Sequence, residues 1–456
     1  MENEYIRGII KAQREFYNTG VSRDVDFRVK SLKRLRSAIM AYEDRLYEAL
    51  WDDLHKSAFE GYLTEVSLVL QEIRYHIRHL KRWAAPRRVS SPFYLPGSRS
   101  RIVSEPLGVV LIVAPWNYPF QLLINPLVGA LSAGNCVVLK PSPYTSRVAR
   151  VMAEMIASVF APEYVAVVQG GYEVNRSLWA ERFDHIFFTG SPELGKVVMK
   201  AAAEHLTPVT LELGGKSPCI VDKDADIGRA AKRIAWGKCL NAGQTCIAPD
   251  YLLVHTRVKN ELLEKLIYYI RQFYGEQPEK SPDYPRIVRQ EAVTRLERLM
   301  PKEKIVYGGK VIPEERFIAP TILDRVSPQD AVMQEEIFGP LLPVVEFYDL
   351  EEAIGYINTR EKPLALYYFG TTASAKKVIA KTSSGGVCIN DTVMHIANGH
   401  LPFGGVGHSG MGRYHGFDSF AAFSNRRSVL ISPTLWDMPL KYPPYRGFKL
   451  LKRFIK

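Results

Sequence analysis

The stretch PLGVVLIVAPWNYPF, residues 106–120, decides the fold class because it begins a regular alternation of short apolar runs and helical segments. The run at 109–113 contains only Val, Leu and Ile. Four more strand-sized, mostly apolar runs follow, at 137–139, 165–168, 185–188 and 209–213. Apolar strands that alternate with helices are typical of a parallel sheet covered on both faces, and ligands bind such sheets at the carboxyl ends of the strands. We therefore predict an α/β fold with its site at that edge.

The segments on either side of this stretch extend the prediction. Residues 27–83 carry apolar positions at helical spacing, which predicts two or three packed helices. Residues 86–100 contain three prolines and several serines, and they indicate a long hairpin or an excursion between elements. A second α/β stretch runs from about residue 216 to 404, with strands near Ile220 and at 365–369.

Composition excludes several classes of protein. The 456 residues are 46% hydrophobic and 24% charged, which is close to the globular average and excludes a disordered or fibrous chain. No apolar run approaches the ~20 residues that span a bilayer, and the charged N-terminal stretch shows no secretory signal. Five cysteines without a CxxC pair argue against a disulfide framework and a zinc site. We expect no metal and a cytoplasmic location.

The net charge of +12 raises the question of an anionic partner. Most basic residues alternate with acidic ones, except in the tail YPPYRGFKLLKRFIK, residues 442–456, which has no acidic residue. This tail could lie on the protein's own surface or on a partner subunit, or it could form a peripheral contact with an anionic membrane. No nucleic-acid-binding motif is present, so we expect no nucleic acid partner.

A glycine-containing turn, FTGSPELG at residues 188–195, follows one predicted strand and opens a helix. Backbone N–H groups at the start of a helix favour a phosphate group. Gly190 and Gly195 are spaced as GxxxxG, however, and the dinucleotide fingerprint is GxGxxG. Taken alone, the turn could therefore be an ordinary glycine turn with a helix cap.

Three further side chains could take part in chemistry. Cys246 ends the small-residue stretch NAGQTC, Glu212 lies near the end of an apolar strand that should raise its pKa, and Asn117 follows another strand end. Each has an ordinary alternative, namely an inert buried cysteine, an edge-strand glutamate and a turn asparagine. Together with the turn at 188–195, they provide a nucleophile, a carboxylate, an amide donor and a phosphate site. This set predicts redox chemistry on a carbonyl through an acyl intermediate.

The chain resembles the aldehyde dehydrogenase superfamily over nearly its whole length. The motifs that carry the resemblance are PWNYPF (115–120), FTGSPELGK (188–196), LELGGKS (211–217), NAGQTC (241–246) and EEIFGP (335–340). Further stretches resemble the class 3 or fatty aldehyde dehydrogenase branch: KPLALYYF (362–369), SGGVCIND (384–391), LPFGGVGHSGMGRYHGFDSFAAFS (401–424) and YPPY (442–445).

The resemblance implies an NAD(P)-dependent oxidation of an aldehyde, medium- or long-chain aliphatic or aromatic, to the carboxylic acid. Cys246 is then the nucleophile that passes through a thiohemiacetal and a thioester. Asn117 and the Cys246 backbone N–H hold the oxyanion, and Glu212 is the general base for hydrolysis. The cofactor contacts implied are Lys140 and Glu336 at the two riboses, Ser191 at the pyrophosphate, Phe338 beside the nicotinamide, and Trp116, Gly190 and Gly195.

The resemblance also implies an aldehyde dehydrogenase-like α/β fold with three parts. A Rossmann-type cofactor-binding domain takes residues 1–86 and 107–212, with 406–424 packed back on it. Residues 213–405 form an α/β catalytic domain, and residues 87–106 and 425–456 form a small β oligomerisation arm and the C-terminal tail. A strand at 424–431 (SNRRSVLI) that joins a neighbour's sheet would give a homodimer.

One position departs from the pattern of many NAD-using relatives. Three residues after Lys140 these relatives have a glutamate that accepts the ribose 2′-hydroxyl, whereas this chain has Pro143. We therefore expect NAD, NADP or both as cofactor.

Two other functions stay open. A CoA-acylating relative would pass the acyl group to CoA, although such relatives often lack the glutamate that matches Glu212. A catalytically silent binding protein could also use this fold, although Cys246, Glu212 and Asn117 are all present.

Overall fold

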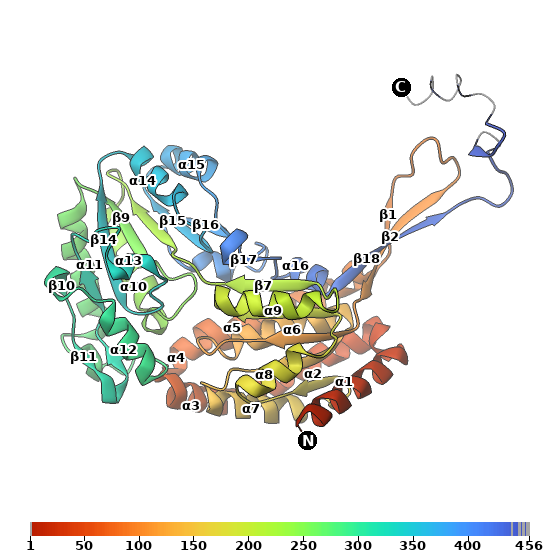
Figure 1. Cartoon of the computed structure of the whole chain (residues 1–456), viewed down its shortest axis with the longest axis horizontal. Helices are drawn as coiled ribbons and strands as arrows, with labels where there is room; N and C mark the ends of the chain where they lie inside the picture. The colour runs from red at the N-terminus through yellow and green to blue at the C-terminus, as the bar shows by residue number, and fades with distance from the viewer. Residues whose placement is uncertain (1, 439–440, 446–447, 449–451, 453–456) are drawn as a thin grey trace.

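The computed structural model (Figure 1) describes residues 2–438, 441–445, 448 and 452. It contains two α/β units that lie side by side, and a β arm that extends from one end of the molecule. The α/β class predicted from the sequence is confirmed. The predicted tail contact with a membrane, a partner subunit or the protein's own surface concerns Arg446, Lys449, Lys452, Arg453 and Lys456. Among these only Lys452 is described, so the contact stays a prediction.

The first unit is built on a six-stranded sheet. Its spatial order is β17 (Gly410–Met411), β7 (Val209–Leu213), β6 (His185–Gly190), β3 (Val109–Val113), β4 (Cys136–Lys140) and β5 (Val165–Val167). All neighbours pair in parallel except β17, which is antiparallel to β7. Strands β3 and β4 are buried throughout, which explains why they read as uninterrupted apolar runs. The five strands predicted between residues 109 and 213 are all confirmed.

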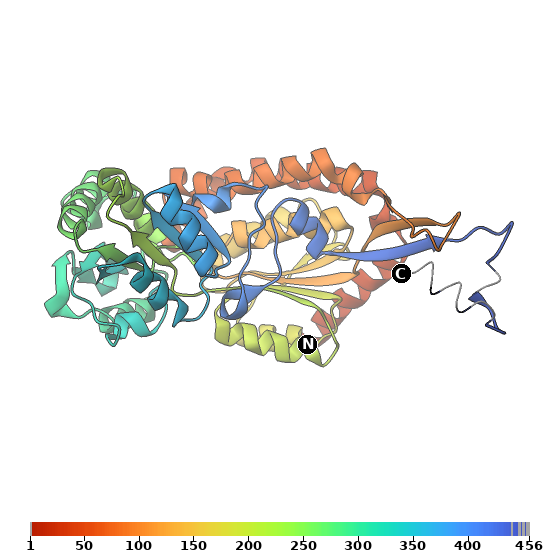
Figure 2. The same ribbon diagram turned by 90° about the horizontal axis from the view of Figure 1, so that it is seen from above.

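Helices cover both faces of this sheet (Figure 2). Helix α6 lies between the sheet and a second layer that includes α2 and α5, so its entire surface is buried. Helix α1 contacts β3 and β4, and α9 contacts β6 and β7. The helices of this unit are α1 (Glu2–Asn18), α2 (Val25–Ala41), α3 (Glu43–Leu54), α4 (Ala58–Gly61), α5 (Ser67–Ala84), α6 (Gln121–Ala133), α7 (Ser146–Ala157), α8 (Tyr172–Trp179), α9 (Pro192–Ala203) and α16 (Phe417–Ala422).

The second unit has a seven-stranded sheet. Its order is β10 (Ile305–Tyr307), β13 (Thr321–Leu323), β14 (Leu341–Phe347), β9 (Tyr251–His255), β8 (Pro218–Val221), β15 (Ala365–Phe369) and β16 (Gly386–Ile389). Only β10 pairs antiparallel to its neighbour. A separate pair is β11 (Val311–Ile312) with β12 (Phe317–Ile318). The helices are α10 (Ile227–Cys239), α11 (Lys259–Tyr274), α12 (Gln290–Arg298), α13 (Ala331–Gln334), α14 (Leu350–Asn358) and α15 (Thr372–Lys381).

The arm is a three-stranded antiparallel sheet in the order β1 (Arg87–Val89), β2 (Arg99–Pro106) and β18 (Ser424–Ile431). The predicted hairpin and the predicted strand at 424–431 are thus confirmed. Strand β18 pairs with β2 along its whole length, from Ser424 opposite Pro106 to Ile431 opposite Arg99. Figure 1 shows the arm extending away from both sheets. None of the described helices is long and apolar enough to cross a membrane.

Candidate active site

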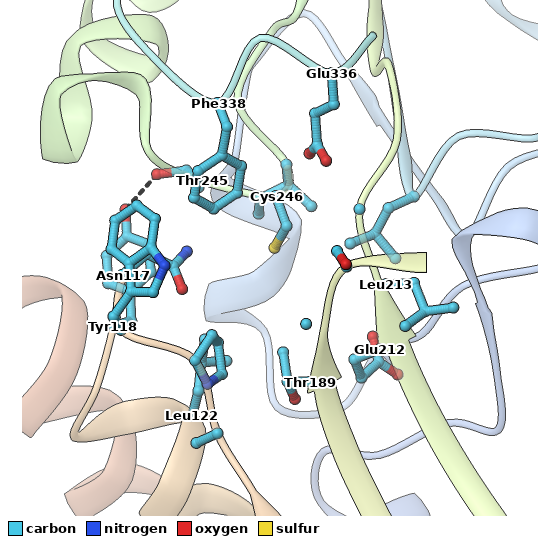
Figure 3. Close-up of a pocket in the computed structure, with 18 of the residues that line it drawn as sticks. Asn117, Tyr118, Leu122, Thr189, Glu212, Leu213, Thr245, Cys246, Glu336 and Phe338 are labelled. Atoms are coloured by element: carbon cyan, nitrogen blue, oxygen red, sulfur yellow. Dashed lines mark hydrogen bonds between the residues drawn. The ribbon is translucent and has the colours of Figure 1, made fainter. Parts of the chain in front are cut away.

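A cavity of about 1160 Å³ lies where the carboxyl ends of β3, β4, β6 and β7 face the second unit (Figure 3). This volume exceeds the ~300–1,000 Å³ that is usual for a site holding one drug-sized ligand. Its walls contain nearly all of the residues that the sequence marked: Trp116, Asn117, Lys140, Gly190, Ser191, Glu212, Cys246, Glu336 and Phe338. Segments up to 222 residues apart in the chain therefore meet at one opening.

Gly195 is the exception, because it does not line the cavity. A Cβ at this position would come within 2.8 Å of Leu213 Cδ2, so the glycine lets α9 approach β7 closely. Gly190 does line the cavity, and there a Cβ would come within 2.5 Å of the Phe188 ring.

Cys246 follows a tightly folded loop. Asn241 and Ala242 both have left-handed backbone conformations with φ of 51°. Asparagine adopts that conformation more readily than most residues, but alanine seldom does, and where a residue such as Ala242 does, a functional site is often nearby. Cys246 is half-buried, and all five cysteines are free thiols. Burial raises the pKa of the Cys246 thiol above its ordinary value, and the carboxyl groups of Glu336 and Glu212 raise it further. The resting group is therefore the thiol.

Asn117 is held from both ends. Its side-chain Nδ2 donates to the Gln244 carbonyl at 3.0 Å, and its own carbonyl accepts from Asn241 Nδ2 at 2.7 Å. Asn117 and Cys246 line the same opening (Figure 3). An amide nitrogen carries two hydrogens, so the bond to Gln244 leaves one of them for a ligand oxygen.

Glu212 lies at the cavity end of β7 and is buried. Neither of its carboxyl oxygens has a hydrogen-bond partner in the described part of the chain. Burial raises the pKa of Glu212 well above its ordinary value, against a smaller opposing effect of Arg413, as its apolar strand predicted. A buried carboxyl group without partners is available to exchange protons with a substrate or a water molecule.

The cavity wall around β4 and α9 suits a phosphate-bearing cofactor. Ser191 caps α9 by accepting from the Leu194 N–H, and residues 190–194 line the opening, so the start of α9 borders the cavity. Lys140, at the end of β4, is 1% exposed, and Nζ donates to the Pro141 carbonyl at 2.7 Å. Burial lowers the pKa of Lys140 to about 8. Its remaining N–H groups can bind ribose hydroxyl or phosphate oxygens.

The opposite wall offers a carboxylate and two aromatic rings. The side chain of Glu336 lies against Gly214, where a Cβ would come within 2.0 Å of Oε2. Burial raises the pKa of Glu336 to about 8. Phe338 has φ of 49°, and its ring meets the Trp116 ring edge-on at 5.4 Å. Ring faces, a hydroxyl acceptor and a helix N-terminus together fit a nicotinamide dinucleotide.

The comparison with protein-family models decides the identity. Residues 2–429 match the model of the aldehyde dehydrogenase family. The chain belongs to this family.

Its similarity to individual aldehyde dehydrogenases is high. The chain is 48% identical to the 4,4'-diaponeurosporen-aldehyde dehydrogenase of Staphylococcus aureus, over 97% of each chain. It is 49% identical to the dimeric NADP-preferring aldehyde dehydrogenase of Canis lupus familiaris, over 96% of this chain and 98% of that one. The solved structure "Substrate bound state of Staphylococcus Aureus AldH" superposes with a TM-score of 0.97 at 47% identity, covering 99% of both chains.

These findings confirm the resemblance, the fold and the activity that the sequence predicted. The protein is an NAD(P)-dependent aldehyde dehydrogenase that oxidises an aldehyde.

Sequence reasoning missed a buried ion pair in this aldehyde dehydrogenase. Lys56 Nζ donates to Glu65 Oε1 at 2.6 Å, and both side chains are fully buried. Lys56 Nζ also donates to the Asn117 carbonyl at 3.2 Å. Neither residue belongs to a motif. In a sequence, a lysine in a helical region is typical of a surface position, and its partner cannot be identified. Only the high burial of such a pair in the fold reveals it.

Proposed function

We propose that Cys246 forms a covalent bond with the aldehyde and that Glu212 then hydrolyses the resulting thioester. The observation that supports this is the position of Cys246, Asn117 and Glu212 around one cavity, with both Glu212 oxygens unpaired among the described residues. The Cys246 thiol releases its proton to water in the open cavity, and the sulfur attacks the carbonyl carbon. The carbonyl oxygen becomes an oxyanion, which accepts hydrogen bonds from the Asn117 amide and the Cys246 backbone N–H.

The chemistry that bound NAD or NADP supplies is acceptance of a hydride from the thiohemiacetal carbon, which leaves a thioester on Cys246. Glu212 next takes a proton from a water molecule, and the hydroxide adds to the thioester carbonyl. The C–S bond breaks, the carboxylic acid leaves, and the proton held by Glu212 passes to the Cys246 sulfur, which restores the thiol and the carboxylate. The cofactor would be held by Lys140, Ser191 and the start of α9 on one side, and by Glu336, Phe338 and Trp116 on the other.

Replacing Glu212 with Gln should slow hydrolysis of the thioester by about 10²–10⁴-fold, because general bases contribute about that much. Hydride transfer should be far less affected, so a rapid burst of NAD(P)H should precede a slow steady state. Since burial raises the pKa of Glu212 well above that of an ordinary glutamate, the wild-type hydrolysis rate should keep increasing with pH above the range in which an ordinary glutamate titrates. The variant should lose this increase. Stopped-flow absorbance checks both features, and equal slowing of the two phases would contradict the role.

We also propose that the substrate is a medium- or long-chain aliphatic, or an aromatic, aldehyde. Apolar side chains line the same cavity as Cys246: Leu63, Leu68, Leu122, Ile247, Val393 and Ile396. Each buried methylene contributes about 0.8 kcal/mol, so kcat/KM should rise about fourfold for each carbon until the channel is full. A panel of straight-chain alkanals tests this.

Adding CoA to the same assay tests the CoA-acylating alternative. An acyl-CoA product in place of the free acid would support that alternative, and the presence of Glu212 favours the acid.

The cofactor site should tolerate both NAD and NADP. Pro143 lines the cavity close in sequence to Lys140, and its side chain cannot accept a hydrogen bond from a 2′-hydroxyl. A carboxylate here would repel a 2′-phosphate by about 1–4 kcal/mol at ~4 Å. Without it, we expect kcat/KM for the two cofactors to differ by less than about two decades. Similarity to the NADP-preferring dog enzyme supports this expectation.

Pro143→Glu should therefore shift the kcat/KM ratio toward NAD by about tenfold or more. The measurement is steady-state kinetics with each cofactor at one saturating aldehyde concentration. Tyr144→Glu, at the neighbouring position, is the matched control for a general effect of charge. An unchanged ratio in Pro143→Glu would contradict the assignment.

We propose a homodimer in which β18 of one chain joins β16 of the other. Strand β16 is an edge strand of the seven-stranded sheet and is half-buried, and β18 pairs on only one side in the described part of the chain. The arm extends away from the chain's own β16 (Figure 1). Open strand edges favour pairing with another chain. The name of the dog relative includes the word dimeric.

Light scattering at micromolar concentration should give twice the chain mass of 51.6 kDa. Val429→Pro in β18 should lower the mass toward one chain, since proline removes an N–H and disrupts pairing. A single-chain mass for the wild type would contradict the dimer.

Two coarser proposals accompany these. The five unpaired cysteines favour a reducing compartment, and we propose a cytoplasmic location.

We also propose a cofactor-binding domain of residues 1–86 and 107–212 with 406–424 packed on it, a catalytic domain of 213–405, and an arm of 87–106 with 425–456. The two separate sheets support this division.

A further inference from the structure

The loop that carries Cys246 keeps an unusual backbone conformation. Asn241 and Ala242 are both left-handed, and non-glycine residues keep that conformation only where the surrounding structure fixes it. From the second unit, Gln244 Nε2 donates to the Asn241 carbonyl and to the Arg286 carbonyl, each at 3.0 Å. These two bonds hold the loop from one side.

Glu60, on helix α4 of the first unit, holds the loop from the other side. Its carboxyl Oε1 accepts from the Asn241 N–H at 2.8 Å, and the residue is buried. The Asn241 side chain in turn contacts Asn117: Nδ2 donates to the Asn117 carbonyl at 2.7 Å and to the Gln244 carbonyl at 3.1 Å. The Gln244 carbonyl also accepts from Asn117 Nδ2 at 3.0 Å. A single carboxyl oxygen therefore fixes a residue that bonds Asn117 to the Cys246 loop.

Glu60 does not line the cavity, so it does not touch an aldehyde or a cofactor bound there. A second bond between the units joins the Tyr118 hydroxyl to Thr245 Oγ1 at 2.6 Å, and both of these residues do line the cavity (Figure 3). A substitution of Glu60 therefore changes how the loop is held and leaves the surface that a ligand contacts as it is.

Glu60 is less strongly charged than an ordinary glutamate. Burial raises the pKa of Glu60 to about 7, against opposing effects of Lys56 and of the Asn241 N–H. Lys56 is already paired, since its Nζ donates to Glu65 Oε1 at 2.6 Å. Glu60 is therefore partly neutral at physiological pH, and a neutral side chain of the same shape can provide the acceptor.

We propose that Glu60 is a positioning residue for the reaction at Cys246. Its Oε1 holds the Asn241 N–H, and through this bond the loop keeps the sulfur and the Cys246 backbone N–H aligned with the Asn117 amide. Without the acceptor, the buried N–H loses its partner and the left-handed turn relaxes, so that these groups move apart. A displacement of about 1 Å can lower a rate by about 10²-fold. This inference rests on the proposed covalent mechanism and concerns the attack of the sulfur on the aldehyde.

Glu60→Leu removes the acceptor and leaves a side chain of similar size. We expect kcat to fall by about 10–100-fold and KM to change by less than about threefold, because the cavity surface is unaltered. In stopped-flow absorbance, the first turnover of NAD(P)H should slow by the same factor. In Glu212→Gln, by contrast, the first turnover should stay fast. The Kd for NADPH, measured by its fluorescence, should match that of the wild type.

Two further variants separate the position of the oxygen from its charge. Glu60→Gln keeps an oxygen at the same distance along the side chain and removes the charge, so kcat should stay within about threefold of wild type. Glu60→Asp keeps the charge and draws the carboxyl group back by one methylene, so kcat should fall by about tenfold. Glu60→Asp retains a polar side chain at this position, so it gives the answer even where Glu60→Leu fails to fold.

Asp184→Leu is the matched control for the loss of a carboxyl group that accepts from the backbone of another element. Asp184 Oδ2 accepts from the Val109 N–H at 2.8 Å, but it lies at the amino ends of the strands and does not line the cavity. Both Leu variants should lower the free energy of unfolding in urea, because each leaves a backbone N–H without its acceptor. Only Glu60→Leu should lower kcat per folded molecule.

The inference is overturned if Glu60→Leu or Glu60→Asp keeps the wild-type kcat, or if Glu60→Gln loses as much kcat as Glu60→Asp. It is also overturned if Asp184→Leu loses as much kcat as Glu60→Leu. Failure of the proposed function appears differently: wild-type enzyme would then form no acyl adduct on Cys246, however the Glu60 variants behave.

Discussion

Cys246→Ala is expected to abolish NAD(P)H formation from every aldehyde, lowering kcat by at least about 10⁴-fold. Removing a covalent nucleophile ends the pathway that depends on it, as in other enzymes with nucleophilic side chains. Of the five cysteines, all of which are described, Cys246 alone lines the cavity. No other thiol can therefore replace it.

The measurement is the steady-state rate with a medium-chain alkanal and each cofactor in turn. Cys388→Ala is the matched control, because Cys388 is also half-buried and free but does not line the cavity. It should keep wild-type kcat. Mass spectrometry after mixing with aldehyde and cofactor should find an acyl adduct on wild-type enzyme and none on Cys246→Ala. Turnover of Cys246→Ala near the wild-type rate would exclude the covalent mechanism.

The six-stranded sheet could be predicted from sequence because its physical signal is local. A parallel strand with both faces buried must be apolar at every position, and β3 and β4 meet that condition. The candidate site residues Asn117, Gly190 and Glu212 then follow directly, because they lie at the carboxyl ends of such strands.

Contacts between distant segments could not be predicted in the same way. Helix α1 (Glu2–Asn18) lies outside the region where helical spacing was clear, and the two-residue strand β17 is too short to have a pattern. A smaller cavity of about 360 Å³ beside α5 combines residues from α5, α6, the turn after β16 and His415, which only the tertiary fold brings together. A glycine in a motif was also ambiguous, since Gly195 serves helix packing and Gly190 lines the cavity.

The ion pair of Lys56 and Glu65 connects several parts of the active site. Glu65 Oε2 accepts from the Phe120 backbone N–H at 2.9 Å and from the Gln121 N–H at 3.3 Å. Lys56 Nζ lies 4.3 Å from the centre of the Tyr118 ring. The pair therefore fixes both ends of the loop that carries Asn117, from the Asn117 carbonyl to the start of α6.

Lys56→Met should lower the free energy of unfolding by about 3–5 kcal/mol, because it leaves the Glu65 charge buried without its cation. The Asn117 carbonyl also loses a donor, so kcat should fall more than KM changes. Urea unfolding and steady-state kinetics measure the two effects. Lys81→Met is the matched control: its pair with Asp26 is exposed and should contribute less than about 1 kcal/mol. Adding Glu65→Gln to Lys56→Met should restore part of the stability, because it removes the unpaired charge and retains a similar shape. If Lys56→Met and Lys81→Met lowered the free energy of unfolding and kcat by equal amounts, the buried pair would not hold the loop.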